Sequence, residues 1–206
     1  MKKNLRLVML APCLLAVFCD PEEGICGLDD PEPFVINVDN ISEFYTTTEP
    51  IWLDGETSSF VLNDCTDTDE TELVLDESVF LEGLFILRLG NENQSLNATV
   101  ANNYSIAIET GESFTGNYCL DAIEFIPELS DNQDTYNYRL GITITEPGNY
   151  CIVNARNSFF DFNDDNNAEI FQDYNTLEDD KIKFVNCDIT YTREGINGFY
   201  FFRITN

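Results

Sequence analysis

The chain has 206 residues, of which 10 are Lys or Arg, 38 are Asp or Glu and none is His, so its formal net charge is −28. The lack of His excludes a Ser-His-Asp or Cys-His catalytic centre and a His-based zinc site. A chain this acidic offers no basic patch for nucleic-acid phosphates. The hydrophobic content of 43% is too high for disorder, and the length suits one or two folded domains.

The chain begins with the pattern of an export signal. A basic segment (residues 1–6) is followed by an apolar run (residues 7–18), which is too short to cross a bilayer of roughly 30 Å as a helix. Cys19 ends that run, and the acidic residues 20–23 come directly after it. The export signal therefore predicts a chain that leaves the cytoplasm.

Cys19 and its acidic neighbours resemble the lipidated cysteine and the surface-export tether of lipoproteins from the Bacteroidota. The resemblance covers the first 23 residues and departs from the usual pattern at Phe18, where these lipoproteins have a small residue. It implies a signal peptide over residues 1–18, a lipid on Cys19 that anchors the protein to the outer membrane at the cell surface, and an acidic tether over residues 19–32. The alternative is a cleaved secretion signal with an unmodified Cys19, in a periplasmic or secreted protein.

Five cysteines remain if the leader is removed and Cys19 carries a lipid, and they are Cys26, Cys65, Cys119, Cys151 and Cys187. No two of them form a CxxC pair of the kind that holds a metal or exchanges electrons. Export permits disulfides. We expect these cysteines either to form two structural disulfides or to be buried as small hydrophobic residues. Cys119 and Cys151 each end the tetrapeptide Gly-Asn-Tyr-Cys, so we predict that these two form one pair.

The rest of the chain has the pattern of an antiparallel β-sheet protein, because short runs rich in Val, Ile, Phe, Tyr and Thr alternate with Gly, Pro, Asn and Asp. We predict one antiparallel β-sandwich domain over residues 33–206, immunoglobulin-like or jelly-roll, with few or no helices. The clearest strands are expected at 34–38, 59–62, 72–75, 84–89, 104–108, 119–126, 136–145, 150–155, 182–191 and 198–205.

Three of these runs carry more detailed predictions. Residues 139–145 alternate, with the even positions apolar, as in a strand with one buried face. Tyr150 follows a Pro-Gly turn at the start of a strand and resembles the tyrosine corner of immunoglobulin-like sandwiches. The aromatic run 199–202 suits a strand that is buried on both faces.

The charge is unevenly distributed along the chain. Residues 7–87 contain no Lys or Arg, yet nineteen of the 38 acidic residues lie there. Such a segment repels itself unless cations or a basic partner screen it. Solubility of an exported protein and adaptation to high salt are two further explanations of the acidic surface.

One loop has the side chains of a calcium site. Oxygen-bearing residues occupy alternate positions at Asp161, Asn163, Asp165, Asn167 and Glu169, and calcium prefers six to eight oxygen ligands. The segment resembles the start of an EF-hand loop, but Asn166 replaces the turn glycine and Gln172 replaces the bidentate glutamate. A solvated Asn/Asp turn is the alternative.

Composition and spacing together favour a protein without catalytic activity or a resident cofactor, calcium being the one candidate ion. We predict an exported surface lipoprotein that displays an acidic β-sandwich to an unknown protein or polysaccharide partner. A calcium-stabilised adhesion or glycan-binding module is the first alternative. A glycan hydrolase that works with two carboxylates is the second, although the single Trp supplies few stacking platforms for sugars.

Overall fold

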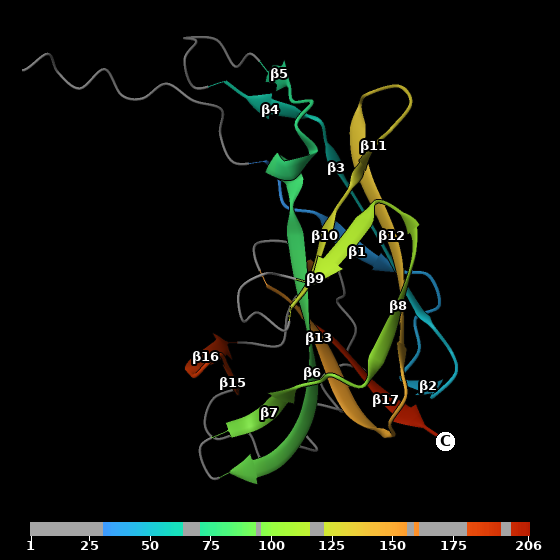
Figure 1. The fold of residues 1–206 in the computed structure, drawn as a ribbon, viewed down its shortest axis with the longest axis vertical. Helices are drawn as coiled ribbons and strands as arrows, with labels where there is room; N and C mark the ends of the chain where they lie inside the picture. The colour runs from blue at the N-terminus through green and yellow to red at the C-terminus, as the bar shows by residue number, and fades with distance from the viewer. Residues whose placement is uncertain are drawn as a thin grey trace, which may run out of the picture.

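The structure, a computed structural model, describes residues 31–63, 71–93, 96–115, 122–155, 159–160, 181–194 and 199–206. Within these ranges the secondary structure is almost entirely β, and the one helical element is a short 3-10 turn, η1 (Glu77–Phe80). Most strand pairs are antiparallel and the sheets are curled (Figure 1). The predicted all-β sandwich is therefore confirmed.

Two large sheets form the sandwich. The first, sheet I, has the order β11 (Glu128–Leu129), β12 (Thr135–Ile144), β3 (Ile51–Ser58), β1 (Val35–Val38) and β14 (Phe159–Phe160), and β8 (Tyr104–Thr110) pairs with the second half of β12. The second, sheet II, has the order β2 (Phe44–Thr46), β17 (Tyr200–Thr205), β13 (Gly148–Asn154), β6 (Glu82–Asn93), β10 (Ile123–Ile126) and β9 (Glu112–Thr115), and β7 (Leu96–Val100) pairs with β6. The β1–β14 and β17–β2 pairs are parallel.

Two small hairpins complete the described fold, one formed by β4 (Phe60–Leu62) with β5 (Thr71–Leu73), the other by β15 (Lys181–Asn186) with β16 (Ile189–Glu194). The second corrects the prediction of one continuous strand over residues 182–191. Cys187 and Asp188, with φ of 54° and 63°, both adopt the left-handed conformation that a two-residue hairpin turn needs. Because neither residue is Gly, the turn has no clear sequence signal.

The central part of sheet II is buried on both faces. Alternate residues of β6, such as Leu84 and Ile86, face a main core shared with sheet I, whereas Phe85 and Leu87 face a second core with Ile182 and Phe184 of the β15–β16 hairpin. Figure 1 shows this hairpin on one side of β6 and β13, and β3, β8 and β12 on the other. The aromatic strand β17 follows the same rule, which confirms its predicted burial on both faces.

The predicted alternation in β12 and the predicted tyrosine corner are both seen. Leu140, Ile142 and Ile144 of β12 are buried in the main core. Tyr150 is fully buried, and its hydroxyl donates a hydrogen bond of 3.0 Å to the backbone oxygen of Glu146, four residues earlier. That bond to the preceding turn is the defining contact of a tyrosine corner.

The sequence analysis did not predict β3, which is the central strand of sheet I. Its middle residues, Asp54 to Thr57, lack the apolar β-branched side chains of a typical strand. Gly55 is nevertheless required there, because the ring of Tyr138 on β12 covers it, and a Cβ at Gly55 would lie 2.3 Å from Tyr138 Cε1.

No helix in the described ranges has the length and apolarity that a membrane crossing requires.

Candidate functional site

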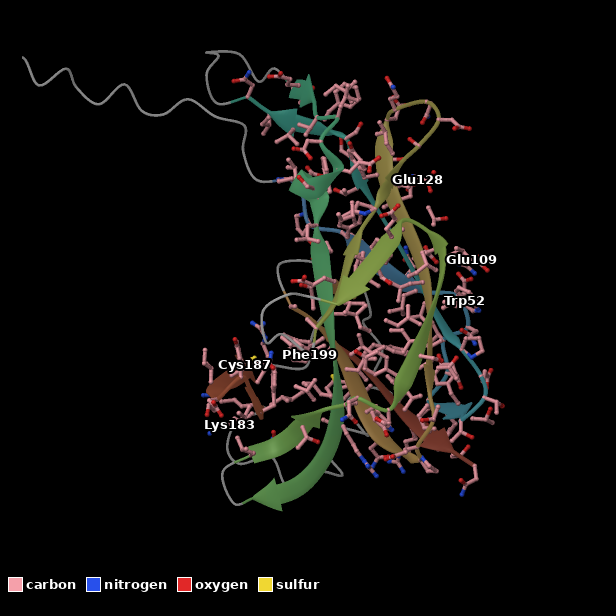
Figure 2. The ribbon with its side chains drawn as sticks, in the orientation of Figure 1. Trp52, Glu109, Glu128, Lys183, Cys187 and Phe199 are labelled. Carbon is pink, nitrogen blue, oxygen red and sulfur yellow. The ribbon has the colours of Figure 1, made fainter. Side chains whose placement is uncertain are left out.

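The outer face of sheet I carries an ion-pair network centred on Arg139. The Arg139 side chain donates from Nε to Glu109, at 2.7 Å, from Nη1 to Asp54, at 3.5 Å, and from Nη2 to Asp39 in a short contact. Glu109 comes from β8, Asp54 from β3 and Asp39 from the turn after β1. One cation thus holds three carboxylates from three segments of the sheet, in the region where Figure 2 labels Trp52 and Glu109.

The environment separates the pKa values of Asp39 and Asp54. The hydrogen bond from Arg139 lowers the pKa of Asp39. Burial, and then the neighbouring Asp39 carboxylate, raise the pKa of Asp54. The two carboxylates also interact with each other. Both carboxylates thus belong to the network around Arg139.

Trp52 completes this network. Its ring lies over Gly141 of β12, where a Cβ would be 3.0 Å from ring atoms, and the Arg139 guanidinium lies 5.0 Å from the ring centroid. A guanidinium at this distance from an indole is stabilised by the π electrons of the ring. Trp52 is only half-exposed, so the packing against Gly141 and Arg139 leaves it a poor platform for a sugar.

We expect Arg139→Met to destabilise the fold by about 1–2 kcal/mol in low salt, because three carboxylates then face one another without a cation. The penalty should shrink in high salt, which screens repulsion, and as the pH is lowered through the range in which Asp39 and Asp54 take up protons. Urea unfolding at two salt concentrations measures this penalty.

Arg88→Met is the matched control. Arg88 pairs with one acid, Glu146, and both side chains are about half exposed, so we expect the free energy of unfolding to fall by less than about 0.5 kcal/mol. Equal losses in the two variants would show that the network adds nothing.

A second feature is an acidic pocket with a volume of about 360 Å³, within the range of small-ligand sites. We call this cavity the acidic pocket. It is lined by Glu77, Gly111, Glu112, Ile126, Pro127 and Glu128. All three carboxylates belong to exposed residues, and no Lys or Arg is among the lining residues. The lining therefore combines three negative charges with two apolar residues, Ile126 and Pro127.

The fold brings these residues together from three separate segments. Glu77 lies in η1, whose N-cap Asp76 accepts a hydrogen bond from the backbone N–H of Ser78, at 3.0 Å, and whose Phe80 stacks on Tyr136 of β12. Gly111, between β8 and β9, has φ of 83°, and a Cβ there would lie 2.6 Å from the backbone oxygen of Ile126. The close approach of these two backbones forms one wall of the pocket.

The acidic pocket has the chemistry to bind a cationic group. Across the described residues, no three acidic or cysteine side chains converge closely enough to bind a metal. Glutamates that are spread around a cavity attract an ammonium or guanidinium group by charge and hydrogen bonding. Ile126 and Pro127 would contact the aliphatic part of such a ligand.

The predicted site residues are only partly placed by the structure. Cys19, Cys119 and the calcium-loop residues Asp161, Asn163, Asp165, Asn167 and Glu169 lie outside the described residues. Cys151 is described, and the predicted disulfide to Cys119 is wrong because Cys151 is a free cysteine. Its side chain faces the second core from the middle of β13, where it is fully buried and acts as a small apolar group.

The sequence held no signal for the acidic pocket, since its three glutamates are separated by long stretches of chain and the chain has many other acids. The pocket is therefore known only from its charge and shape in the structure. A comparison with protein-family models, with curated proteins and with solved structures finds no match for this chain.

Proposed function

We propose that this chain is an exported, lipid-anchored binding module without catalytic activity, and that its acidic pocket receives a cationic group of a partner. The pocket is the observation that carries the proposal: a cavity of about 360 Å³ lined by Glu77, Glu112 and Glu128, with no cation among its lining residues. The partner would be a protein or an amino-bearing polysaccharide, recognised through an ammonium or guanidinium group.

Two further observations support a binding role rather than catalysis. The acidic residues of the outer face around Arg139 are engaged with that cation, whereas those of the acidic pocket are exposed and face a cavity. The surrounding acidic surface would also draw a basic partner towards the pocket, because a field of one sign raises the rate of encounter.

The test uses a lysine-rich peptide and its fully acetylated form as probes, and measures binding by titration calorimetry. We expect the unmodified peptide to bind. Glu77→Gln, Glu112→Gln and Glu128→Gln, made together, should weaken that binding by about tenfold or more, because each removes a charge-assisted hydrogen bond. The acetylated peptide, which lacks the positive charges, should not bind.

A control variant separates the pocket from the general charge of the surface. Glu32→Gln, Glu43→Gln and Glu49→Gln change the net charge by the same amount, and none of these residues lines the pocket. This variant should lose less than about twofold in affinity at physiological salt. Equal losses in both variants would overturn the pocket as the binding site, as would tight binding of the acetylated peptide.

Lipid anchoring is tested separately by metabolic labelling with a fatty acid. The proposal requires label on the wild-type chain and none on Cys19→Ala. Because this readout does not depend on the acidic pocket, failure of one half of the proposal leaves the other half testable.

A further inference from the structure

The edge strand β8 has edge-blocking features at one end only, where Glu109 is charged and the register with β12 shifts. Within the part of the chain that the structure describes, β8 pairs with β12 alone, so one side of it is an open edge of sheet I. Natural sheets block such edges with charged residues (above all Lys), Pro, β-bulges or very short strands. The edge strands β2 and β11 are only three and two residues long, whereas β8 has seven residues and neither Lys nor Pro.

The regular part of β8 is uncharged. A register shift between Arg139 and Leu140 leaves Glu109 outside the regular ladder, which runs from Tyr104 to Ile108. Glu109 itself is held by Arg139 at 2.7 Å. On a chain with a net charge of −28, this five-residue segment is therefore a locally neutral surface.

The inward side of this edge is incompletely covered. Ile106 and Ile108 pair with Ile142 and Leu140 of β12, which are buried in the main core, so they lie on the same inner face of sheet I. Ile106 is only half-buried, and 36% of Ile108 is exposed. Another strand along this edge would cover both side chains and satisfy the open backbone groups.

We propose that β8 binds β8 of a second copy of this chain, in antiparallel orientation about a two-fold axis at Ile106. This register pairs all five regular residues: Ile106 lies opposite its own copy, Tyr104 opposite Ile108, and Ser105 opposite Ala107. The inner side then carries aromatic and β-branched pairs, which are favourable across strands, and the outer side carries small residues. No two charges of the same sign lie directly opposite each other in the paired segment.

The expected dimer is weak and depends on salt. Pairing one short strand buries far less than the roughly 1,200–2,000 Å² of a stable interface. The acidic surfaces of the two copies also repel each other, and salt screens that repulsion over about 10 Å. Dimerisation should therefore increase with protein concentration and with added salt.

Sedimentation velocity of the purified protein, from about 5 to about 500 μM and in about 0.15 and 1 M NaCl, tests the inference. We expect a dimer whose fraction rises with both variables. Ile108→Glu should raise the dimer Kd by about tenfold or more, since it places a charge opposite Tyr104 of the partner. Amide hydrogen exchange of residues 104–108 should slow as the concentration rises.

The matched control is Ile189→Glu, the same chemical change at an exposed isoleucine of β16. Figure 2 shows the neighbouring Cys187 on the side of the molecule away from Glu109. The control variant should dimerise like the wild type, and circular dichroism melts confirm that both variants fold. A monomer at every concentration and salt, unchanged dimerisation of Ile108→Glu, or equal loss in Ile189→Glu would overturn the inference.

Discussion

Gly55→Ala should destabilise the protein by about 3 kcal/mol, which corresponds to roughly 6–12 °C in Tm for a chain of this length. The added methyl group would lie 2.3 Å from Cε1 and 2.6 Å from Cζ of Tyr138. Tyr138 has no space to move, because Phe125 and Phe34 pack against it with ring centroids 4.3 and 5.3 Å away. The clash therefore has to be relieved by separating β3 from β12.

Two other glycines provide the controls. Gly141 lies on the outer face of sheet I, where an added Cβ would be 3.0 Å from the Trp52 ring. Because that half-exposed ring can move towards solvent, Gly141→Ala should lower the free energy of unfolding by only about 1 kcal/mol. Gly90 has no atom within 4 Å of a Cβ, so Gly90→Ala should be neutral or slightly stabilising. Urea unfolding of the three variants measures this order.

A double-mutant cycle identifies the clashing partner. If Tyr138 causes the loss, Gly55→Ala should cost much less in a Tyr138→Val background, and the coupling between the two positions should exceed about 1 kcal/mol. Equal costs in the two backgrounds, or a Gly55→Ala loss no larger than that of Gly141→Ala, would show that the Gly55–Tyr138 packing is not what sets the spacing of these strands.

The second large effect is a loss of stability in alkali. Burial raises the pKa of Tyr45, Tyr138 and the Cys151 thiol well above their ordinary values, and the Tyr200 hydroxyl, 2.5 Å from that of Tyr45, adds to the effect there. The folded chain keeps these protons at a pH where the unfolded chain releases them. Stability is therefore fully present below about pH 9 and falls as the pH rises, by up to about 1.4 kcal/mol per pH unit for each group.

Urea unfolding between about pH 8 and 11.5 measures this slope, and tyrosinate absorbance of the native protein shows whether the hydroxyls keep their protons. Tyr138→Phe should make the free energy of unfolding depend less steeply on pH, by the contribution of one ionisable group. It should also raise stability at neutral pH by about 1 kcal/mol, because the Tyr138 hydroxyl is buried with no hydrogen-bond partner in the described structure.

Tyr136→Phe is the control on the same face of β12. The Tyr136 hydroxyl donates a 2.9 Å hydrogen bond to the backbone oxygen of Val74, so its removal should lower stability by about 1 kcal/mol. A free energy of unfolding that stays constant from about pH 9 to 11 would contradict the alkaline prediction, as would titration of all nine tyrosines of the native protein near pH 10.

The sequence by itself determined the fold class and most of the strands, because both follow from local patterns. The apolar alternation of residues 139–145 indicates a strand with one buried face, and the aromatic run 199–202 indicates a strand that is buried on both faces. The tyrosine corner at Tyr150 was visible for the same reason, since its hydroxyl bonds a backbone oxygen only four residues away.

Contacts between distant segments were decided only by the tertiary structure. β3 is a strand through its pairing with β1 and β12, although its middle residues are not typical of one. Cys151 is a free thiol buried in the second core. The acidic pocket exists because η1, the β8–β9 turn and β11 converge. Each depends on partners far away in the chain, and one sequence contains no signal for such pairing. Local periodicity therefore predicts which face of a strand is buried, whereas the side chains that meet there are set by how the sheets pack.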